Sequence, residues 1–265
     1  MTEAELRLRP ASSEARACKV CGAASPAFGT LDFNRSCEEA RGRFLTLSGV
    51  AVQYRRCEAC GLIFTDAFDD WGQADFEAHI YNDRYIDVDP EYAEARPLSL
   101  SRGLASMFAA SADRLQVLDY GAGNGRMAQA LRDHGFASVT TYDPFTPEFR
   151  TRPEGRFDLV TCFETVEHMP DPAAGVADLA SFVADDGLLM IGTLLQPNDI
   201  ERIGVAWWYI GPRNGHVTLF THDALTRLLD RQGLRLVSQN ANVHFGFRNT
   251  PPAFARHLFQ SARIP

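Results

Sequence analysis

The sequence predicts an α/β fold in which a doubly wound, mostly parallel sheet follows a small cysteine-rich module. Two observations favour this fold: strand-like and helix-like segments alternate over residues 116–241, and two C-x-x-C pairs lie in the first quarter of the chain. Such alternation is typical of a parallel sheet covered by helices on both faces. We therefore expect a zinc ribbon over residues 1–66, a helical connector or lid over 67–114 and the α/β domain over 115–265.

Hydrophobic patterns place the individual elements of the α/β domain. Short apolar runs predict strands at Gln116–Asp119, Ser138–Asp143, Phe157–Phe163, Leu188–Thr193 and Leu234–Gln239. Apolar residues on one side predict helices at Gly123–His134 and Ala173–Ala184. Thr221 is a suitable N-cap for a third helix, which Gly233 would end.

The first 114 residues carry weaker signals. Phe44–Tyr54 alternates loosely with β-branched and aromatic residues, which predicts a short ribbon leading into the second cysteine pair. Residues 66–113 are acidic and aromatic, and their leucines between residues 98 and 108 have helical spacing. This second segment is the expected connector.

Four cysteines form the pattern C-x2-C-x35-C-x2-C, and a glycine follows each pair. They are Cys18, Cys21, Cys57 and Cys60. Two such knuckles suit a tetrahedral zinc ion, because each glycine permits the tight turn that directs backbone amides at sulfur. Four thiolates leave no open coordination position, so the sequence predicts a structural zinc. Cys37 and Cys162 are left over, and we expect them to be packed.

Residues 117–125 read Val-Leu-Asp-Tyr-Gly-Ala-Gly-Asn-Gly, an apolar strand that runs into a glycine turn and then a helix. Glycines in such a turn let the backbone approach a ligand, and the helix N-terminus offers free amide donors. A dinucleotide fingerprint would need G-x-G-x-x-G, yet the third glycine is Gly125 and Arg126 follows it. The pattern therefore disfavours a nicotinamide cofactor.

Two aspartates accompany the turn. Asp143 closes the next strand and lies 20 residues after Gly123 (143 − 123), where a carboxylate can accept both hydroxyls of an adenosine ribose. Asp119 lies at the strand end before the turn, which favours a ligand with an ammonium or sulfonium centre. Each feature alone also occurs in ordinary strand-to-helix junctions, so the combination is what predicts a cofactor site.

The segments Asp119–Gly125, Asp143 and Phe157–His168 resemble successive motifs of class I S-adenosylmethionine-dependent methyltransferases. The resemblance covers roughly residues 115–240 and implies S-adenosyl-L-methionine as cofactor. It implies that Gly121 and Gly123 pass close to the methionine moiety and that Asp143 binds the ribose. The cofactor-binding set that we expect is Asp119, Tyr120, Gly121, Ala122, Gly123, Asn124, Asp143, Pro144, Phe145, Phe163 and Glu164.

The chain departs from this family after Asp143. Only 13 residues, 144 to 156, separate Asp143 from Phe157, too few for the family's usual helix and third strand. The adenine-contacting position that normally follows that strand is not located, and Phe145 is the candidate that remains.

A long segment, Gln196–Phe220, follows a predicted strand and concentrates aromatic and hydrogen-bonding groups. Ligands of open α/β sheets lie at the carboxyl ends of strands, so this segment is the expected acceptor pocket. His216 is the best general base in the sequence, although a histidine here can equally fix the loop by hydrogen bonding. His168 is the second histidine candidate, more commonly structural or on the cofactor side.

The combination of cysteine module, cofactor motif and this segment is similar to sugar C-methyltransferases that act on nucleotide-linked deoxysugars. Those enzymes carry a His-Glu-His element; His216 matches its second histidine, Asn214 replaces the first and Gly215 replaces the glutamate. That family also draws a tyrosine from the connector, which Tyr81 or Tyr85 would supply. The expected catalytic set is His216, Tyr81, Tyr85 and His168.

Charge and composition narrow the partners. The net charge of −8 and pI near 5.4 disfavour broad nucleic-acid binding, since phosphate binding depends on Lys and Arg. An RNA methyltransferase with an RNA-binding zinc module is the alternative, but residues 1–66 hold nine basic and eight acidic residues. No apolar run suits a membrane helix or secretory signal, so we expect a cytoplasmic enzyme with a small-molecule acceptor. A non-catalytic scaffold is disfavoured because the glycine turn and Asp143 are intact. The oligomeric state is not predicted.

Overall fold

A computed structural model describes residues 6–259, and the outer ends of the expected zinc ribbon and α/β domain, residues 1–5 and 260–265, lie outside this range. The chain forms two compact units, each assembled from segments that are distant in sequence. The first unit comprises Met1–Pro90, Glu167–Ala173 and Leu194–Arg227; the second comprises Glu91–Val166, Ala174–Thr193 and Leu228–Pro265. The expected three-part division at residues 66 and 114 follows the sequence linearly and stays a prediction.

The second unit contains a six-stranded sheet in the order β11-β12-β9-β8-β6-β7. β7, β6, β8 and β9 are parallel, whereas β12 and β11 are antiparallel to their neighbours. The expected mostly parallel sheet is therefore confirmed. Its strands are β6 (Gln116–Tyr120), β7 (Ser138–Tyr142), β8 (Phe157–Phe163), β9 (Val183–Gly192), β11 (Arg235–Ser238) and β12 (Val243–Phe247).

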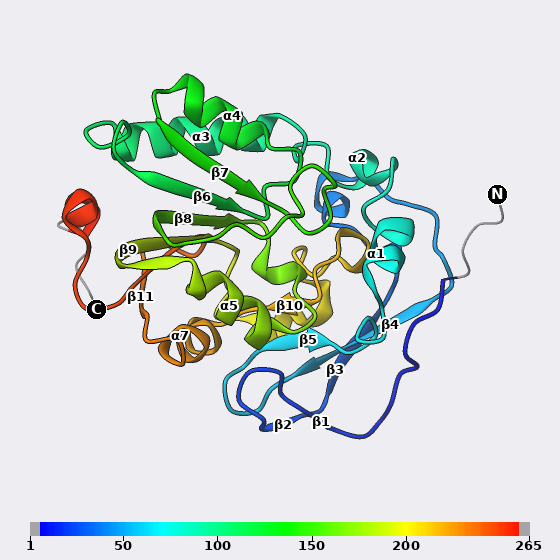
Figure 1. Cartoon of the computed structure of the whole chain (residues 1–265). Coiled ribbons are helices and arrows are strands. Elements are labelled where there is room, and N and C mark those ends of the chain that lie inside the picture. Colours follow the sequence, from blue (N-terminus) through cyan, green and yellow to red (C-terminus); the bar gives the residue numbers. More distant parts are fainter. Residues whose placement is uncertain (1–5, 260–265) are drawn as a thin grey trace. The chain divides into compact units, whose positions relative to one another are not determined.

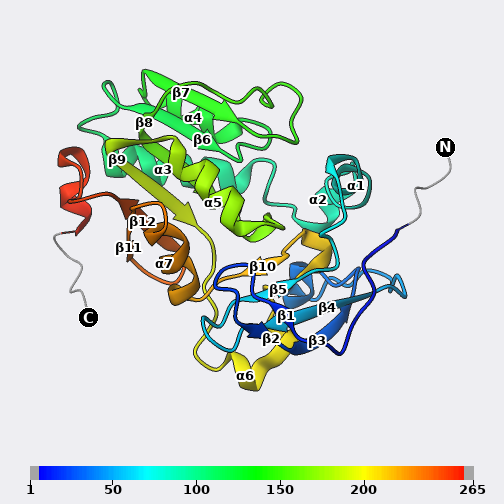
Figure 2. The same ribbon diagram turned by 60° about the horizontal axis from the view of Figure 1, so that its bottom comes forward.

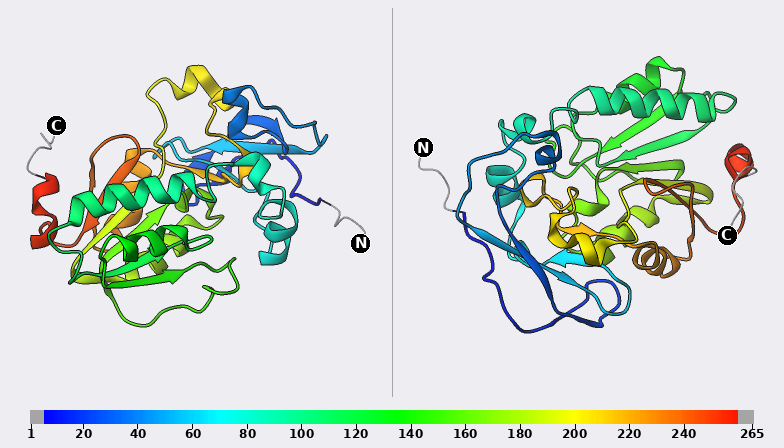
Figure 3. Two further views of the ribbon diagram at one scale, coloured as in Figure 1. Left: turned by 90° about the horizontal axis from the view of Figure 1, so that it is seen from above. Right: turned by 180° about the vertical axis from the view of Figure 1, so that it is seen from behind.

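Helices cover both faces of this sheet (Figure 1). α3 (Ala95–Phe108) and α4 (Arg126–Asp133) lie side by side on one face, as Figure 3 also shows, and α5 (Pro172–Ser181) lies on the other. Because successive strand residues point to opposite faces, Val117 packs in the core beneath α3 and α4 while its neighbour Leu118 is buried on the other face. The doubly wound arrangement follows from strands that are apolar on both faces.

The structure corrects several element boundaries. α4 begins at Arg126, not at Gly123, because the glycines before it have left-handed backbone. α5 ends at Ser181 and β9 already begins at Val183, five residues before the expected strand start. β12 was not predicted; it is a short antiparallel return after the turn around residue 240.

Residues 144–156 form no helix or strand, as the short spacing indicated, and β7 is consequently the edge of the sheet. The strand that would lie beyond it in the related family has no counterpart in the described part of this chain. The adenine-contacting position therefore has no strand end to mark it.

The first unit contains an antiparallel sheet in the order β10-β5-β4-β3 and a small β1-β2 pair (Figure 2). The strands are β1 (Arg16–Ala17), β2 (Ala24–Ser25), β3 (Ala27–Asp32), β4 (Ala51–Arg56), β5 (Ile63–Thr65) and β10 (Thr218–Leu219). The predicted ribbon over Phe44–Tyr54 is wrong in its first half. Phe44 and Leu47 are 72% and 77% exposed. Because neither side chain packs on a buried face, the alternating pattern does not hold this segment in a strand.

Short helices complete both units. The first unit holds α1 (Gln73–His79), α2 (Tyr85–Val88), α6 (Ile200–Ile203) and the start of α7 (His222–Asp230), with 3-10 turns at Cys37–Arg41, Gly204–Ala206 and Pro212–Asn214. The 3-10 turn Val166–His168 starts at the last residue of a second-unit segment and continues into the first unit. A further 3-10 turn, Ala253–Phe259, belongs to the second unit. Residues 67–114 contain α1, α2 and α3, and a single helical connector over this range stays a prediction.

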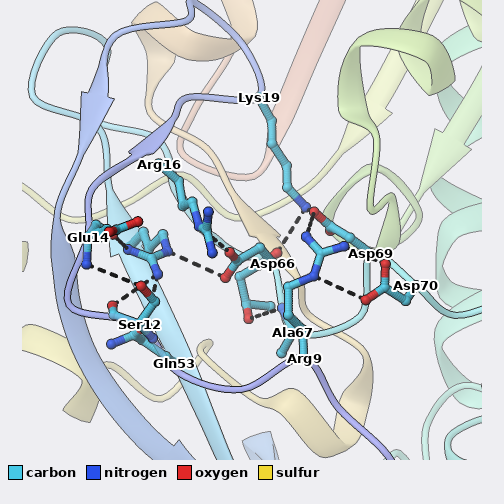
Figure 4. Close-up of polar contacts among 12 residues, drawn as sticks. Arg9, Ser12, Glu14, Arg16, Lys19, Gln53, Asp66, Ala67, Asp69 and Asp70 are labelled. Atoms are coloured by element: carbon cyan, nitrogen blue, oxygen red, sulfur yellow. Dashed lines mark hydrogen bonds and ion pairs between the residues drawn. The ribbon is translucent and has the colours of Figure 1, made fainter.

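The extended N-terminal segment is held by charged side chains (Figure 4). The buried Arg55 guanidinium donates to the carbonyls of Glu14 (2.7 Å) and Ser12 (3.1 Å), and Asp66 pairs with both Arg55 and Arg16. Lys19 donates to Asp69 at 2.5 Å. These contacts lay the segment along β4 within the first unit.

Among residues 6–259, no helix has the length and apolar character that crossing a bilayer requires.

Candidate functional site

The glycine turn lies in the second unit, between β6 and α4. Gly121, Gly123 and Gly125 all have positive φ, at 75°, 53° and 71°, which side chains rarely tolerate. A Cβ on Gly121 would lie 2.3 Å from the Thr165 hydroxyl, and one on Gly125 would lie 2.8 Å from the Phe149 ring. At Gly123 no heavy atom lies within 4 Å of that position. The middle of the turn is therefore open beside its backbone, as close approach of a ligand requires.

Asp143 is fixed against this turn. It follows β7 and is buried, and its Oδ2 accepts the Gly123 N–H at 2.8 Å. Its Oδ1 accepts the Phe145 N–H at 2.8 Å, and the Thr146 hydroxyl donates to the Gly123 carbonyl at 2.8 Å. Each carboxylate oxygen keeps a further lone pair, so the group can still accept hydroxyls from a ligand. The structure thus brings together the two residues that the 20-residue spacing paired.

Asp119 lies deeper in the same unit and is 2% exposed. The Thr161 hydroxyl donates to its Oδ1 at 3.4 Å, while Oδ2 has no hydrogen-bond partner within residues 6–259. Burial raises the pKa of Asp119 to about 7, and the charge of Asp143 adds to the shift while the Thr161 hydroxyl opposes it. A buried carboxylate with an orphaned oxygen suits a cationic ligand group, which would restore the ordinary pKa.

The end of β8 is conformationally unusual. Glu164 has φ of 49°, the only positive φ at a non-glycine residue in the described range, and its N–H donates to the Gly192 carbonyl at 2.8 Å. A Cβ on Gly192 would lie 2.4 Å from the Phe163 ring. Strained backbone of this kind often marks a functional position, since neighbouring contacts must hold it.

Three other predicted cofactor residues make contacts within the second unit, two through their side chains and one through its backbone. The Tyr120 hydroxyl donates to Asp178 at 3.0 Å, and the Asn124 amide donates to the Ala93 carbonyl at 2.8 Å. Phe145 contributes its backbone N–H to Asp143. The Ala122 N–H donates to the Tyr142 carbonyl at 3.2 Å, and Pro144 follows Asp143 directly. A role for these five residues in cofactor binding stays a prediction.

The expected catalytic residues all lie in the first unit. His216 is buried, and its Nδ1 lies 2.7 Å from the Tyr209 carbonyl. A carbonyl only accepts, so Nδ1 donates in this bond and a neutral His216 carries its lone pair on Nε2. The His168 ring is 4.9 Å from the His216 ring, centroid to centroid.

The two candidate tyrosines join the same group. The Tyr81 hydroxyl lies 3.1 Å from His168 Nδ1, and the Tyr81 and Tyr85 rings are 5.4 Å apart. The Tyr85 hydroxyl donates to the Asn214 carbonyl at 3.3 Å. The structure therefore brings together all four residues of the expected catalytic set, which the sequence separates by 135 positions (216 − 81). We call this group the histidine cluster, and it also includes Glu167 and Tyr209.

The four cysteines of the C-x-x-C pairs also converge in the first unit. Their sulfurs lie within 4.8 Å of one another, with Cys18–Cys60 at 3.6 Å and Cys21–Cys57 at 3.4 Å. The edge of a tetrahedral zinc–thiolate site is about 3.8 Å long, so the set fits zinc. The hydrogen bond between Cys18 and Cys60 lowers the pKa of the Cys18 thiol and raises that of Cys60, so the two sulfurs share one proton when no metal is bound.

The comparisons with known proteins agree with the α/β unit. Residues 92–239 match the family described as "Methyltransferase domain". The chain belongs to this methyltransferase-domain family. The match confirms the resemblance to class I S-adenosylmethionine-dependent methyltransferases, although it does not assign an acceptor.

Individual relatives match only part of this chain and at modest sequence identity. The chain is 31% identical over 101 residues to a ubiquinone biosynthesis O-methyltransferase of Coxiella burnetii and 32% identical over 104 residues to one of Neisseria meningitidis. These matches cover 29% and 30% of this chain and 43% and 44% of the relatives, so the chain spans less than half of their length. A 1,6-didemethyltoxoflavin-N1-methyltransferase from Burkholderia thailandensis superposes with a TM-score of 0.48 at 15% identity, over 78% of this chain and 99% of that one.

Sequence reasoning missed several residues of these sites. Glu167 directly precedes the candidate His168, and no local pattern in the sequence predicts its burial. Tyr209 was one aromatic residue among many in the loop. Thr161 and Thr165 contact the aspartate and glycine of the turn, but hydroxyl residues on a buried strand and the turn after it carry no distinguishing pattern.

The buried Asp119 generates a prediction about stability. Because its pKa is raised when folded, the unfolded chain releases its proton first, so the residue costs stability progressively as pH rises from about 4 to about 7. An asparagine side chain cannot ionise, so Asp119→Asn should remove this pH-dependent loss in the free energy of unfolding. We expect the ligand-free variant to be more stable than the wild type at pH 7.5 but not at pH 4. Urea unfolding at both pH values measures the difference, and equal stability at pH 7.5 would contradict the assignment.

Proposed function

We propose that this chain transfers a methyl group from S-adenosyl-L-methionine to a small-molecule acceptor. The observation that carries the proposal is the hydrogen bond between Gly123 and Asp143 beside an open left-handed turn, in a chain of the methyltransferase-domain family. The turn supplies backbone for close approach and the carboxylate supplies acceptors for ribose hydroxyls.

The residues of the second unit suit this cofactor. Asp143 would accept the ribose hydroxyls, the backbone around Gly123 would lie along the methionine moiety, and Asp119 would offset positive charge. When bound, S-adenosyl-L-methionine supplies an electrophilic methyl group on a sulfonium. The protein's own task is to orient the acceptor and exclude water.

We assign the acceptor side to the histidine cluster. With Nδ1 bonded to the Tyr209 carbonyl, the neutral His216 ring presents a lone pair on Nε2 and can take a proton from an acceptor. Tyr81 contacts His168 and would orient it, and Tyr85 holds the loop through Asn214. The connector carrying both tyrosines would act as a lid.

A sugar or natural-product intermediate is the acceptor class that we favour. The named relatives, a ubiquinone biosynthesis enzyme and a toxoflavin N-methyltransferase, are small-molecule methyltransferases by name. RNA is the competing acceptor. Binding to an RNA phosphate backbone depends on positive charge, and the net charge of −8 gives little support to it. Gel retardation with bulk RNA at low salt distinguishes the two acceptor classes. An enzyme that acts on RNA would retard the RNA band, whereas an enzyme that acts on a small molecule would leave the band in place.

We further propose that the cysteine set holds one structural zinc ion. The supporting observations are the sulfur distances and the C-x-x-C spacing. Reduced thiolates of this kind persist in a reducing compartment, so we also propose a cytoplasmic location.

The general-base role of His216 predicts a kinetic effect. His216→Ala should retain binding of S-adenosyl-L-methionine but slow methyl transfer by roughly 100- to 10,000-fold, the loss typical of a missing general base. Single-turnover rates with radiolabelled cofactor measure the effect once a small-molecule screen has supplied the acceptor. His222→Ala, an exposed histidine of the same unit, is the matched control and should transfer at the wild-type rate. An unchanged rate in His216→Ala would remove this residue from the mechanism.

The zinc proposal predicts a stoichiometry. Purified protein should contain one zinc per chain, and Cys57→Ser should lose it together with the fold of the first unit, since a metal-bound state stabilises the folded chain. Elemental analysis and thiol titration measure both quantities. Protein without zinc but with four titratable thiols among residues 18–60 would disprove the metal site.

A further inference from the structure

A second set of metal-ligating side chains lies apart from the cysteines, inside the histidine cluster. Glu167, His168 and His216 each offer one ligand atom, and these atoms all lie within 4.8 Å of one another. We propose that these three residues bind a divalent cation. Two imidazoles and one carboxylate on one side of an ion, with positions left open, form a recurrent site for first-row metals.

Side chains behind the ligands already hold them in position. Tyr209 contacts two of the three: its carbonyl accepts the Nδ1–H of His216, and its hydroxyl donates a short hydrogen bond to the Glu167 carboxylate. A metal-ligating histidine usually donates its other ring N–H to a carbonyl or carboxylate, which fixes the tautomer. The His216 contact is of this kind, so Nε2 is the ring nitrogen that would bind the ion.

The third ligand is positioned in the same way. The Tyr81 hydroxyl lies 3.1 Å from His168 Nδ1, so the other nitrogen of that ring is the one suited to an ion. Gly215 permits this packing, because a Cβ there would lie 3.1 Å from both His168 Nδ1 and the Tyr81 oxygen, and its φ is 86°. A residue with a side chain at position 215 would push the ring and the hydroxyl apart.

Backbone contacts tie the two ligand-bearing segments together. The Val217 N–H donates to the Glu167 carbonyl at 2.9 Å, and the Thr218 hydroxyl donates to the Met169 carbonyl at 2.9 Å. The residues flanking His216 are thus bonded to the residues flanking His168. A site assembled before the ion arrives costs little ordering when it binds.

Burial and ligand type also favour a cation. Glu167 is 0% exposed and His216 is 5% exposed, and a cation would offset the cost of burying the carboxylate. The nitrogen and oxygen donors differ from the four thiolates, which favour softer ions. The chain therefore offers two sites of different selectivity in one unit.

This inference goes beyond the proposed function. A cation on His216 would occupy the Nε2 lone pair that the proposed general base uses, so the cation and the proton compete for one nitrogen. We therefore expect a bound cation to prevent His216 from acting as the base.

Metal binding to zinc-replete wild type tests the inference without any cofactor or acceptor. Mn²⁺ titration followed by electron paramagnetic resonance, and Co²⁺ titration followed by absorption, should each show one saturable site per chain beyond zinc, the Co²⁺ bands lacking thiolate charge transfer. Glu167→Gln, nearly isosteric, should abolish this site while keeping the zinc content. Tyr209→Phe removes the bond behind the carboxylate, together with a 3.4 Å contact from the Leu194 N–H, and should weaken affinity by about 10- to 100-fold, as losses of such outer contacts do. His222→Ala should bind as the wild type does.

Two results would overturn the proposal: no saturable binding of either ion to the wild type, or unchanged affinity in both Glu167→Gln and Tyr209→Phe. Circular dichroism and zinc content show whether Glu167→Gln has folded, and Tyr209→Phe keeps the proposal testable if it has not. Cation binding is measured without S-adenosyl-L-methionine. Its failure would therefore leave methyl transfer with a His216 base standing, whereas failure of cofactor binding would leave the cation result unchanged.

Discussion

The proposed cofactor site of this protein depends on one hydrogen bond, from the Gly123 N–H to the Asp143 carboxylate. It joins the turn after β6 to the end of β7, and the turn has three glycines with left-handed backbone. The bond holds the carboxylate at the edge of the turn while further lone pairs stay available. The parallel pairing of β6 with β7 brings the two residues to the same edge of the sheet, so the fold itself produces the site.

The histidine cluster depends on a comparable constraint in the first unit. β10 pairs with β5, the strand that directly follows the second cysteine pair, and His216 lies two residues before β10. The Tyr54 hydroxyl, from β4, donates to the His216 carbonyl at 2.8 Å. The cysteine-bearing segment therefore supplies strands that position His216, so the proposed zinc would influence that residue through them.

The sequence predicted what periodicity and spacing control. The parallel strands, the glycine turn with Asp143 and the converging cysteines followed from apolar runs and fixed offsets along the chain. It failed where tertiary packing decides. Phe44 alternates with its neighbours yet forms no strand, and β12 carries too short a signal to be recognised. Glu167 and Tyr209 become functional candidates only through contacts between segments about 40 residues apart, which no local pattern reports.

Calorimetry with S-adenosyl-L-methionine and with its demethylated product, on folded and zinc-replete protein, tests the central claim most directly. The account predicts one saturable site per chain for each compound. Asp143→Ala should weaken both by about tenfold or more, because it removes hydrogen bonds to a charged group. Absence of binding heat with both compounds, or equal affinity in wild type and Asp143→Ala, would contradict the assignment of this turn and carboxylate to the cofactor.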